Sequence, residues 1–394
     1  MGWSLTKTVV PLASRVLLIL GAAVLSGAGE ALLGNCGPFT DTANDAFCPF
    51  VLEIFYLGIT TGTMATTFSP SDNVSRLQMA AFLSRTVDRA LLRGSRRAAL
   101  SQFWTPANRD NLTIVTLGFS APAIRSDGAD VWVPTEFSDQ VFRVRGNDAK
   151  LLETWTGATG GSAVLSAQGR VFVLGKQTPG RLYLLDPSQP AGVVTTVASN
   201  LGDSPTGIAF DGARIWTANQ AGKSVSIVTR TASPPWTVTT VTAGFSNLTG
   251  ILWDGGNIWT TDALAGTLLK LDASGAILQT VTTGPFPSYP IYDGANIWVP
   301  NATAPSVTVV RASNGAVLET LTGNGMDTPI TAAFDGQRIL VTNEGNDSVS
   351  LWKAADLSPL GSVSFGSGAL PQAACSDGTH FWIMLNATGL LARF

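Results

Sequence analysis

Histidine, cysteine and charged residues are all scarce in this sequence of 394 residues. It contains one histidine, His380, and three cysteines, at positions 36, 48 and 375. One histidine excludes a histidine-rich zinc site, and the cysteines lie too far apart in the chain for a zinc cluster. Any Ser-His-Asp triad would have to use His380. The sequence also lacks a G-x-S-x-G nucleophile elbow and a phosphate-binding G-x-x-x-x-G-K loop.

Low charge also limits the choice of partners. Only 13 % of the residues are charged, and the formal net charge is -3. No run of lysine and arginine is interleaved with aromatic residues, as single-strand binding requires. The composition therefore indicates no nucleic-acid partner.

The first 31 residues have the pattern of a signal peptide. Lys7 and Arg15 precede the apolar run VLLILGAAVLSG (16–27), and small residues follow it. The run is too short and too rich in glycine for a membrane span. We predict export to the cell surface, the periplasm or the medium, with cleavage after Ala28 or Ala31. An uncleaved N-terminal anchor is the alternative.

Export would permit disulfide bonds. Cys36 and Cys48 are close together in the sequence and are the predicted pair. Cys375 stands alone in the strand-like stretch QAACSDG (372–378), where we expect a small buried hydrophobic residue. A nucleophilic role is disfavoured because no histidine is available to activate the thiol.

A nine-residue stretch recurs through most of the chain. Residues 293–301 read DGANIWVPN, and related stretches begin at Asp127, Asp211, Asp254, Asp335 and Asp377. A degenerate copy, AQGRVFVLG (167–175), has Gln168 in place of the aspartate. With it, successive copies start 41, 43, 43, 39, 42 and 42 residues apart. The sequence therefore contains seven copies of one unit.

Each unit contains four short strand patterns. In 205–244, PTGIAF, RIWTAN, SVSIVT and TVTTVTAG follow one another, and the Asp-Gly pair predicts a two-residue hairpin turn between the first two. Helical periodicity is absent. Four antiparallel strands at this period are typical of a propeller blade, with the Thr-rich strand outermost. We predict a mainly β fold, a seven-bladed β-propeller over 105–394.

The two ends of this region complement each other. The chain finishes after GLLARF, which matches the third strand of a unit, and NLTIVTLG (111–118) matches a fourth strand. The last blade is therefore predicted to combine three C-terminal strands with one N-terminal strand. Such closure removes the open edges of the array.

A large apolar residue recurs at one position of each unit. It is expected to pack between neighbouring blades rather than to stack on a sugar. The residues at this position are Trp132, Phe172, Trp216, Trp259, Trp298, Leu340 and Trp382.

The stretch PTGIAFDGARIWTANQAGKSVSIV (205–228) resembles the YVTN/NHL class of seven-bladed propellers, which includes streptogramin-lyase-like repeats. The resemblance covers about residues 111–394, and it implies the fold but no single activity, because such repeats serve many roles. Streptogramin lyases use a histidine and a divalent metal near the central mouth. His380 lies instead in the hairpin SDGTHFW (376–382), which in the usual layout is on the opposite face.

Oxygen-bearing side chains recur where the second strand of a unit ends. If ring closure gathers them on one face of the channel, they could bind Ca²⁺ or Mg²⁺, or polar groups of a sugar or peptide. The alternative is that each side chain caps its own loop. The candidates are Asn219, Asp262, Asn301, Asn343, Glu136 and Glu344.

Residues 36–100 do not fit the repeat and contain two helical patterns. The first places Phe50, Ile54, Phe55 and Leu57 on one face. Asp72 or Asn73 is the expected N-cap of the second. The arginines between positions 85 and 97 extend this region at helical spacing, as a solvated linker helix or as an interfacial basic helix.

The stretches PFTD (38–41), GITTG (58–62) and FSPSDNVSR (68–76) resemble an S-layer homology (SLH) domain. Such domains attach proteins to bacterial cell-wall polymers, often as three copies. This chain has one copy, and the usual Thr-Arg-Ala-Glu is replaced by Ser-Arg-Leu-Gln (75–78). Arg76 is the candidate contact to an anionic wall polymer. A spacer that has lost wall binding is the alternative.

These features predict an exported bacterial envelope protein with a signal peptide (1–31), an SLH-like module and a propeller. We expect the propeller to be a non-enzymatic binding or scaffolding surface for a protein, peptide or glycan. A metal-dependent lyase or lactonase acting at the channel mouth is the alternative. A solute-sensing module with a membrane partner is a third possibility.

Overall fold

The computed structural model describes residues 38–42, 48–56, 59–83, 86 and 113–393. The chain divides into two compact units, Met1–Arg93 and Gly94–Phe394. The predicted signal peptide and most of the arginine-rich segment lie outside the described residues. Among the residues described, no helix is both long and apolar enough to span a membrane.

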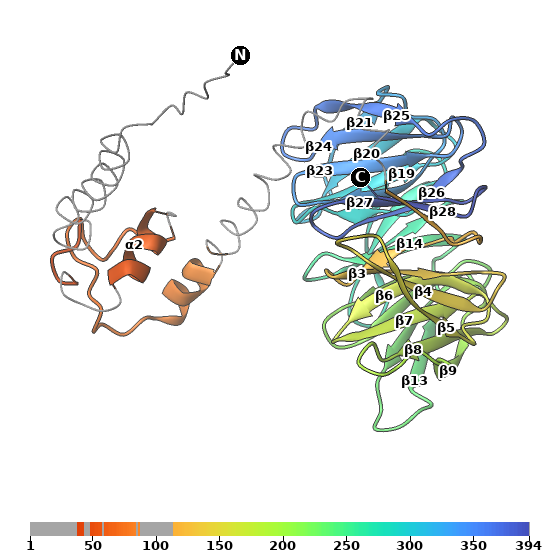
Figure 1. Cartoon of the computed structure of the whole chain (residues 1–394), viewed down its shortest axis with the longest axis horizontal. Coiled ribbons are helices and arrows are strands. Elements are labelled where there is room, and N and C mark those ends of the chain that lie inside the picture. Colours follow the sequence, from red (N-terminus) through yellow and green to blue (C-terminus); the bar gives the residue numbers. More distant parts are fainter. Residues whose placement is uncertain (1–37, 43–47, 57–58, 84–85, 87–112, 394) are drawn as a thin grey trace, which may run out of the picture. The chain divides into compact units, whose positions relative to one another are not determined.

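The second unit consists of seven four-stranded antiparallel sheets, the blades of a propeller (Figure 1). The first strand of each blade contacts the first strands of both neighbouring blades, so these strands form a closed inner ring. The predicted seven-bladed β-propeller is confirmed.

In every blade the strand order runs from the inner ring outwards. The first three blades are β2 (Arg125–Ser126), β3 (Asp130–Pro134), β4 (Gln140–Arg145), β5 (Leu151–Thr156); β6 (Gly161–Ala167), β7 (Arg170–Gly175), β8 (Gly180–Leu185), β9 (Thr195–Leu201); β10 (Pro205–Phe210), β11 (Ile215–Asn219), β12 (Ser224–Thr229), β13 (Thr237–Val241). The next three are β14 (Leu248–Trp253), β15 (Ile258–Asp262), β16 (Thr267–Leu271), β17 (Ile277–Thr282); β18 (Ile291–Tyr292), β19 (Asn296–Asn301), β20 (Ser306–Arg311), β21 (Val317–Thr322); β22 (Pro329–Phe334), β23 (Arg338–Asn343), β24 (Ser348–Lys353), β25 (Pro359–Ser364). The seventh is β26 (Pro371–Ser376), β27 (Phe381–Leu385), β28 (Leu390–Arg393) and β1 (Thr113–Thr116).

The seventh blade joins the two ends of the propeller. β1 pairs antiparallel with β28, from Thr113 opposite Arg393 to Thr116 opposite Leu390. Val115 is buried in the same apolar cluster as residues of β27. The N-terminal strand therefore closes the ring, as the sequence predicted.

The Asp-Gly hairpins are four-residue loops, so the prediction of two-residue turns was wrong for these blades. In the third blade Phe210 pairs with Ile215, and Asp211 N donates to Arg214 O across the loop. Asp211 Oδ1 accepts two further backbone N–H groups of the loop. Only the glycine then needs a positive φ, which is 95° for Gly212. The aspartate carboxylate therefore shapes the wider loop.

The degenerate copy of the repeat in the second blade does form a two-residue turn. Ala167 pairs directly with Arg170, and the intervening Gln168 and Gly169 have φ values of 52° and 68°. Positive φ at both central residues is the geometry of a type I′ hairpin. A tight turn thus occurs where the capping aspartate is missing.

The turn aspartate also binds the recurrent tryptophan. In five blades the indole Nε1–H donates to the aspartate Oδ2 at 2.7–2.8 Å, and the indole is fully buried. Each buried indole N–H therefore has an acceptor, which a core position requires. The pairs are Asp127–Trp132, Asp211–Trp216, Asp254–Trp259, Asp293–Trp298 and Asp377–Trp382.

Two blades lack this aspartate–tryptophan pair, and in neither is a buried donor or acceptor of the pair left alone. The second blade has Gln168 and Phe172, so the acceptor and the donor are both absent. The sixth blade keeps Asp335 but has Leu340 in place of tryptophan, and Arg338 donates to the aspartate at 2.7 Å. The aspartate and the indole are therefore kept or lost together unless another donor takes over.

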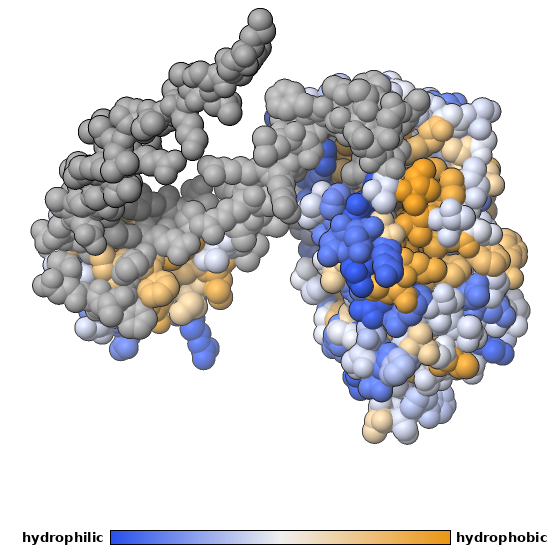
Figure 2. Space-filling model, in the orientation of Figure 1, coloured by the Kyte–Doolittle hydropathy of each residue, from blue (hydrophilic) through white to orange (hydrophobic). Residues whose placement is uncertain are grey.

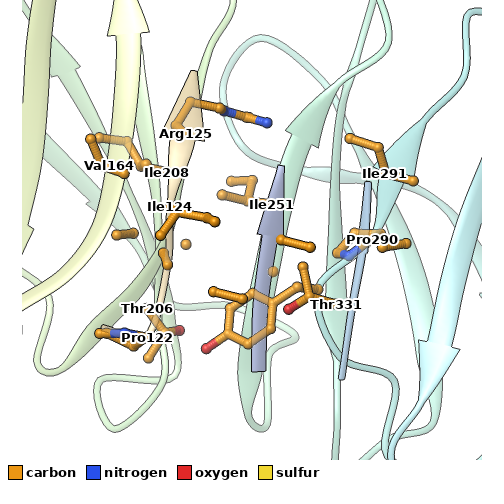
Figure 3. Close-up of a pocket in the computed structure, with 18 residues that line it drawn as sticks. Pro122, Ile124, Arg125, Val164, Thr206, Ile208, Ile251, Pro290, Ile291 and Thr331 are labelled. Carbon is orange, nitrogen blue, oxygen red and sulfur yellow. The ribbon is translucent and has the colours of Figure 1, made fainter. Parts of the chain in front are cut away.

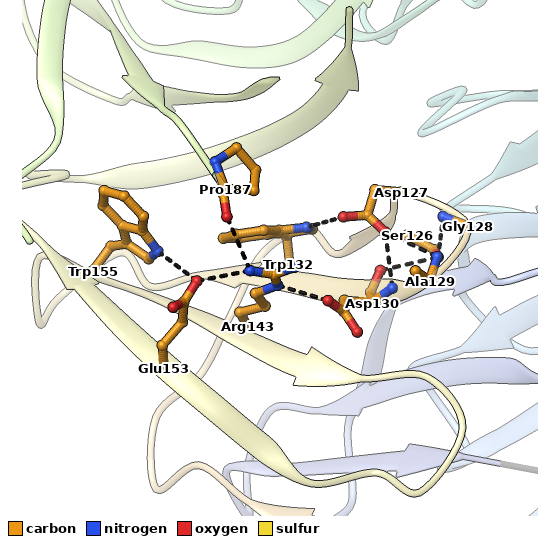
Figure 4. A network of polar contacts seen from close by, with 10 residues as sticks. All are labelled: Ser126, Asp127, Gly128, Ala129, Asp130, Trp132, Arg143, Glu153, Trp155 and Pro187. Carbon is orange, nitrogen blue, oxygen red and sulfur yellow. Dashed lines mark hydrogen bonds and ion pairs between the residues drawn. The ribbon is translucent and has the colours of Figure 1, made fainter. Parts of the chain in front are cut away.

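Arg143 connects the first two blades (Figure 4). Its guanidinium lies over the Trp132 ring, 5.2 Å from the centroid, and donates to Asp130 at 2.6 Å and to Glu153 at 3.0 Å. It also donates to the carbonyl oxygen of Pro187 in the second blade. Two carboxylates thus compensate this partly buried cation, as burial of a charge requires.

The first unit contains two helices in the described residues. α2 covers Cys48–Tyr56, and a second helix follows Ser75. Ser75 Oγ accepts from Gln78 N at 3.2 Å, and Gln78 Oε1 accepts from Ser75 N at 2.8 Å. The prediction of Asp72 or Asn73 as N-cap was wrong, because this reciprocal pair is a capping box.

A small apolar core holds this unit together. Phe39 is fully buried, with the rings of Phe55 at 5.2 Å and Phe68 at 5.7 Å. Asp41 accepts the backbone N–H groups of Phe68 and Ser69. These hydrogen bonds lower the pKa of the Asp41 carboxyl. The PFTD stretch is therefore structural, with Phe39 as core and Asp41 as a brace.

Candidate functional site

The predicted channel-mouth residues Asn219, Asn301 and Asn343 are fully buried inside their own blades. Each Nδ2 donates to two hydroxyls of the third strand at 2.7–3.1 Å. These contacts brace the connection between the second and third strands and use both amide hydrogens. The hydroxyl pairs are Ser224 and Ser226, Ser306 and Thr308, and Ser348 and Ser350.

The amide oxygens of these asparagines differ between blades. Asn219 Oδ1 accepts from Thr217 Oγ1 at 2.8 Å. In the described part of the chain, the buried Oδ1 atoms of Asn301 and Asn343 have no hydrogen-bond partner. Both blades have valine two residues earlier, where the third blade has Thr217. In the fifth and sixth blades the threonine hydroxyl that would donate to the asparagine Oδ1 is therefore absent.

Asp262 is also buried and occupied. Its carboxylate accepts the backbone N–H of Ser246 at 2.7 Å and of Asn247 at 3.0 Å, together with the Ser246 hydroxyl. Ala265 N donates to it as well, at 3.3 Å. The carboxylate thus holds the loop that precedes β14 and the loop that follows β15.

Unlike these four buried residues, the two glutamates are only partly buried. Glu136 pairs with Lys176 at 3.3 Å, an ion pair between the first and second blades. Glu344 is half-buried, and its backbone N–H donates to Thr328 O. No hydrogen bond or ion pair of the described residues joins any two of the six candidates.

A divalent cation needs several oxygen ligands that can turn towards it. The Asp262 oxygens and the amide of Asn219 already serve protein donors. In the described ranges no three or more His, Cys, Asp or Glu side chains are placed to hold a metal. Asp262 and Asn219 are therefore occupied by protein donors, and a Ca²⁺ or Mg²⁺ site stays a prediction.

The environments of Cys375, His380 and Cys48 are those of residues with a structural role. Burial raises the pKa of the Cys375 thiol to about 12, so the thiol is neutral at physiological pH. His380 lies in the Asp-Gly loop of the seventh blade, with Nδ1 3.3 Å from Asp377 Oδ2. Cys48 is disulfide-bonded. Its predicted partner, Cys36, lies outside the described residues, so that pairing stays a prediction.

The inner ring of strands encloses a central cavity of about 90 Å³ (Figure 3). Every blade contributes to its wall through its first strand or the residues just before it. The wall is mainly apolar or small, with Ile124, Ile208 and Ile251 among its side chains. Its ionisable side chains are Arg125 and Tyr289.

Arg125 extends from β2 into this cavity, with its guanidinium on the side of Ile291 (Figure 3). Arg125 is exposed to solvent, although desolvation by the protein atoms around its guanidinium lowers its pKa. Within the described residues its guanidinium makes no hydrogen bond or ion pair. It is a cation without a compensating anion, unlike Arg143.

Sequence reasoning missed Arg125, although a signal was present. The position two before the turn aspartate is small or apolar in the other blades. An arginine there breaks the repeat. The aligned residues are Ser166, Ala209, Leu252, Ile291, Ala333 and Cys375.

Tyr289 supplies the second polar group of the wall. Burial, with a contribution from the charge of Glu136, raises the pKa of Tyr289 to about 12. Its hydroxyl therefore keeps its proton and can donate a hydrogen bond. Tyr289 directly precedes Pro290 and the two-residue strand β18, and Arg125 begins the two-residue strand β2. The two ionisable groups of the wall therefore lie in or just before the two shortest inner strands, β2 and β18.

In the first unit, Arg76 lies in the first turn of the helix that follows Ser75. Its side chain is exposed and makes no hydrogen bond or ion pair with other described residues. The position predicted for polymer binding is thus open to solvent.

Fold and geometry define a seven-bladed propeller protein that carries a small helical module. Residues 38–80 match the family model of the S-layer homology domain, which confirms that resemblance. An SLH domain indicates a wall-associated protein of the cell surface.

The propeller is similar to solved structures of known enzymes. Virginiamycin B lyase from Staphylococcus aureus matches with a TM-score of 0.61 and 15% identity, over 72% of this chain and 98% of that chain. A streptogramin B lyase matches with a TM-score of 0.58 and 15% identity, over 72% and 96%. Hydrazine synthase of Kuenenia stuttgartiensis matches with a TM-score of 0.59 and 15% identity, over 71% and 97%. These likenesses show the fold alone. No protein of curated function matches the chain in sequence.

Proposed function

We propose that this chain is an exported envelope protein that binds a cell-wall polymer through its SLH module and presents the propeller as a non-enzymatic binding or scaffolding surface. The SLH match over 38–80 is the observation that carries the proposal. Arg76 supports it, because an exposed guanidinium can form charge-assisted hydrogen bonds with anionic polymer groups.

The surface of the propeller supports a binding role. The face seen in Figure 2 carries an apolar area bordered by hydrophilic side chains. Phe137, Val193 and Leu264 are among the exposed large apolar residues of the propeller. Exposed apolar area with a polar border is typical of interaction surfaces. The buried Asn and Asp side chains at the strand ends serve the blades themselves, which also favours binding over catalysis at that position.

Wall binding can be tested by sedimenting the full chain with purified bacterial cell walls. We expect the wild-type protein to pellet with the walls and Arg76→Ala to bind about tenfold more weakly, the loss of one charge-assisted contact. Arg181→Ala is the matched control, because Arg181 is exposed on the propeller. Equal binding by Arg76→Ala and wild type, or no pelleting at all, would contradict the proposal.

The alternative is a metal-dependent lyase or lactonase, which the fold likeness to the two lyases favours. A thermal melt of the full chain with EDTA and then with Ca²⁺ or Mg²⁺ tests it, since binding to the native state must raise the melting temperature. We expect no metal-dependent rise. A rise that is lost in Asn301→Ala, measured against that variant's own melt in EDTA, would favour the enzyme instead.

A further inference from the structure

Arg125 is an uncompensated cation in an apolar cavity. Arg143 pairs with Asp130 and Glu153, and Arg338 pairs with Asp335, whereas Arg125 has no carboxylate partner among the described residues. The ionisable neighbour of Arg125 is Cys375, a buried thiol that stays neutral at physiological pH. Because Arg125 is exposed to solvent, its charge does not need a protein partner, and its guanidinium is open to an anion that enters the cavity.

The cavity has room for a small molecule beside the guanidinium. Its volume of about 90 Å³ exceeds several times the 10–15 Å³ that one water requires. Isoleucines 124, 208, 251 and 291 supply apolar wall from four different blades (Figure 3). The protonated hydroxyl of Tyr289 adds one donor to this wall. A convergent charge in an otherwise apolar concavity is the usual composition of a ligand site.

We propose that the central cavity binds a small carboxylic acid with a short apolar body, whose carboxylate pairs with Arg125. The guanidinium presents a planar fork that matches a carboxylate in a bidentate manner. The isoleucines contact the apolar body, and Tyr289 is available to a polar group on it. This inference rests on the proposed non-enzymatic binding role of the propeller and names its ligand class.

Isothermal titration of the full chain with butyrate tests the proposal, with butyramide as the neutral ligand of the same shape. We expect saturable binding of one butyrate per chain and at least tenfold weaker binding of butyramide. Arg125→Gln should weaken butyrate binding at least tenfold. Arg125→Lys should fall between the two, because lysine keeps the charge but loses the fork.

The folding control uses the melting temperature of each variant. Removing an uncompensated cation should leave the melting temperature of Arg125→Gln unchanged or raise it. A large drop would show that Arg125 has a structural partner and would overturn the proposal. Equal binding of butyrate and butyramide would overturn it too. So would binding of inorganic phosphate at Arg125 without binding of butyrate.

These outcomes are separable from those of the wall-binding test. Pelleting with cell walls depends on the SLH module and on Arg76, whereas butyrate binding depends on Arg125. A chain that pellets but does not bind butyrate would refute the cavity site alone. A chain that binds butyrate but does not pellet would refute wall attachment alone.

Discussion

The indole nitrogen of Trp298 donates a 2.8 Å hydrogen bond to Asp293, five residues earlier in the same blade. The same carboxylate accepts the backbone N–H groups of Ala295 and Asn296 in its loop. One side chain therefore closes the hairpin and satisfies a buried indole. Its contributions can be separated by mutation.

Asp293→Ala should lower the free energy of unfolding by about 2 kcal/mol, because it leaves the buried indole and two loop N–H groups without an acceptor. In a Trp298→Phe background the same change should cost less, since one of these donors is already absent. Denaturant unfolding followed by fluorescence and by circular dichroism measures both. Strictly additive effects would contradict a direct Asp–Trp coupling.

Acid should destabilise the propeller over a defined pH range. Burial alone would raise the pKa of Asp377, but hydrogen bonds from His380, Trp382 and the loop backbone outweigh it and lower the pKa from 3.8 to about 2. The pKas of Asp127 and Asp211 are lowered in the same way. A carboxyl whose pKa is lower in the folded state stabilises it above pH 4, and this stabilisation is lost as the pH falls towards 2.

The measurement is the melting temperature as a function of pH. We expect a steep fall between pH 4 and 2 for the wild type. Asp377→Asn should start lower and show a shallower fall, because that side chain no longer titrates. Parallel curves for the two proteins would contradict the assignment.

Val341→Thr should stabilise the sixth blade. The buried Oδ1 of Asn343 has no partner among the described residues, whereas Thr217 donates to Asn219 in the third blade. A threonine two residues before Asn343 would supply that donor. The expected gain in unfolding free energy is about 1 kcal/mol, the typical net value of one hydrogen bond.

Val173→Thr is the matched control in the second blade. Val173 is equally buried, but the residue two positions later is Gly175, which offers no side-chain acceptor. A hydroxyl buried without a partner should cost about 1–3 kcal/mol. Equal effects of the two substitutions in denaturant unfolding would show that Asn343 is satisfied in another way.

Deletion of residues 111–117 should destabilise the whole propeller and promote aggregation. It removes β1, exposes the edge of β28 and takes Val115 out of the core of the first and seventh blades. Melting and light scattering measure the two effects. Ile114→Thr is the control, because this side chain is half-exposed and the substitution keeps the strand. An unchanged melting temperature of the deletion variant would refute the closure.

The repeat period made the propeller predictable, but the site was harder to predict. Asn219, Asn301 and Asn343 recur at one position of three blades, where each braces the second strand of its blade against the third. Recurrence therefore reflects the needs of the repeat. Arg125 occurs once, at a position that is small or apolar elsewhere, and a search for recurring residues passes over it.

The role of the turn aspartate could not be deduced from turn propensity alone. Asp-Gly suits a two-residue turn, but the wider loop forms wherever the aspartate accepts from a side-chain donor, an indole five residues later in five blades and Arg338 in the sixth. The joint loss of aspartate and tryptophan in the second blade was visible in the sequence, at Gln168 and Phe172. Comparing the blades position by position, rather than reading each turn separately, would have found the pair.

The ring closure has a mechanical consequence for a propeller held by its N-terminal unit. Any pulling force transmitted along the chain enters the propeller at Thr113. The first hydrogen bonds that it loads are those of the four residue pairs between β1 and β28. These same pairs complete the ring, so tension on the tether acts directly on the seam of the propeller before it reaches any other blade.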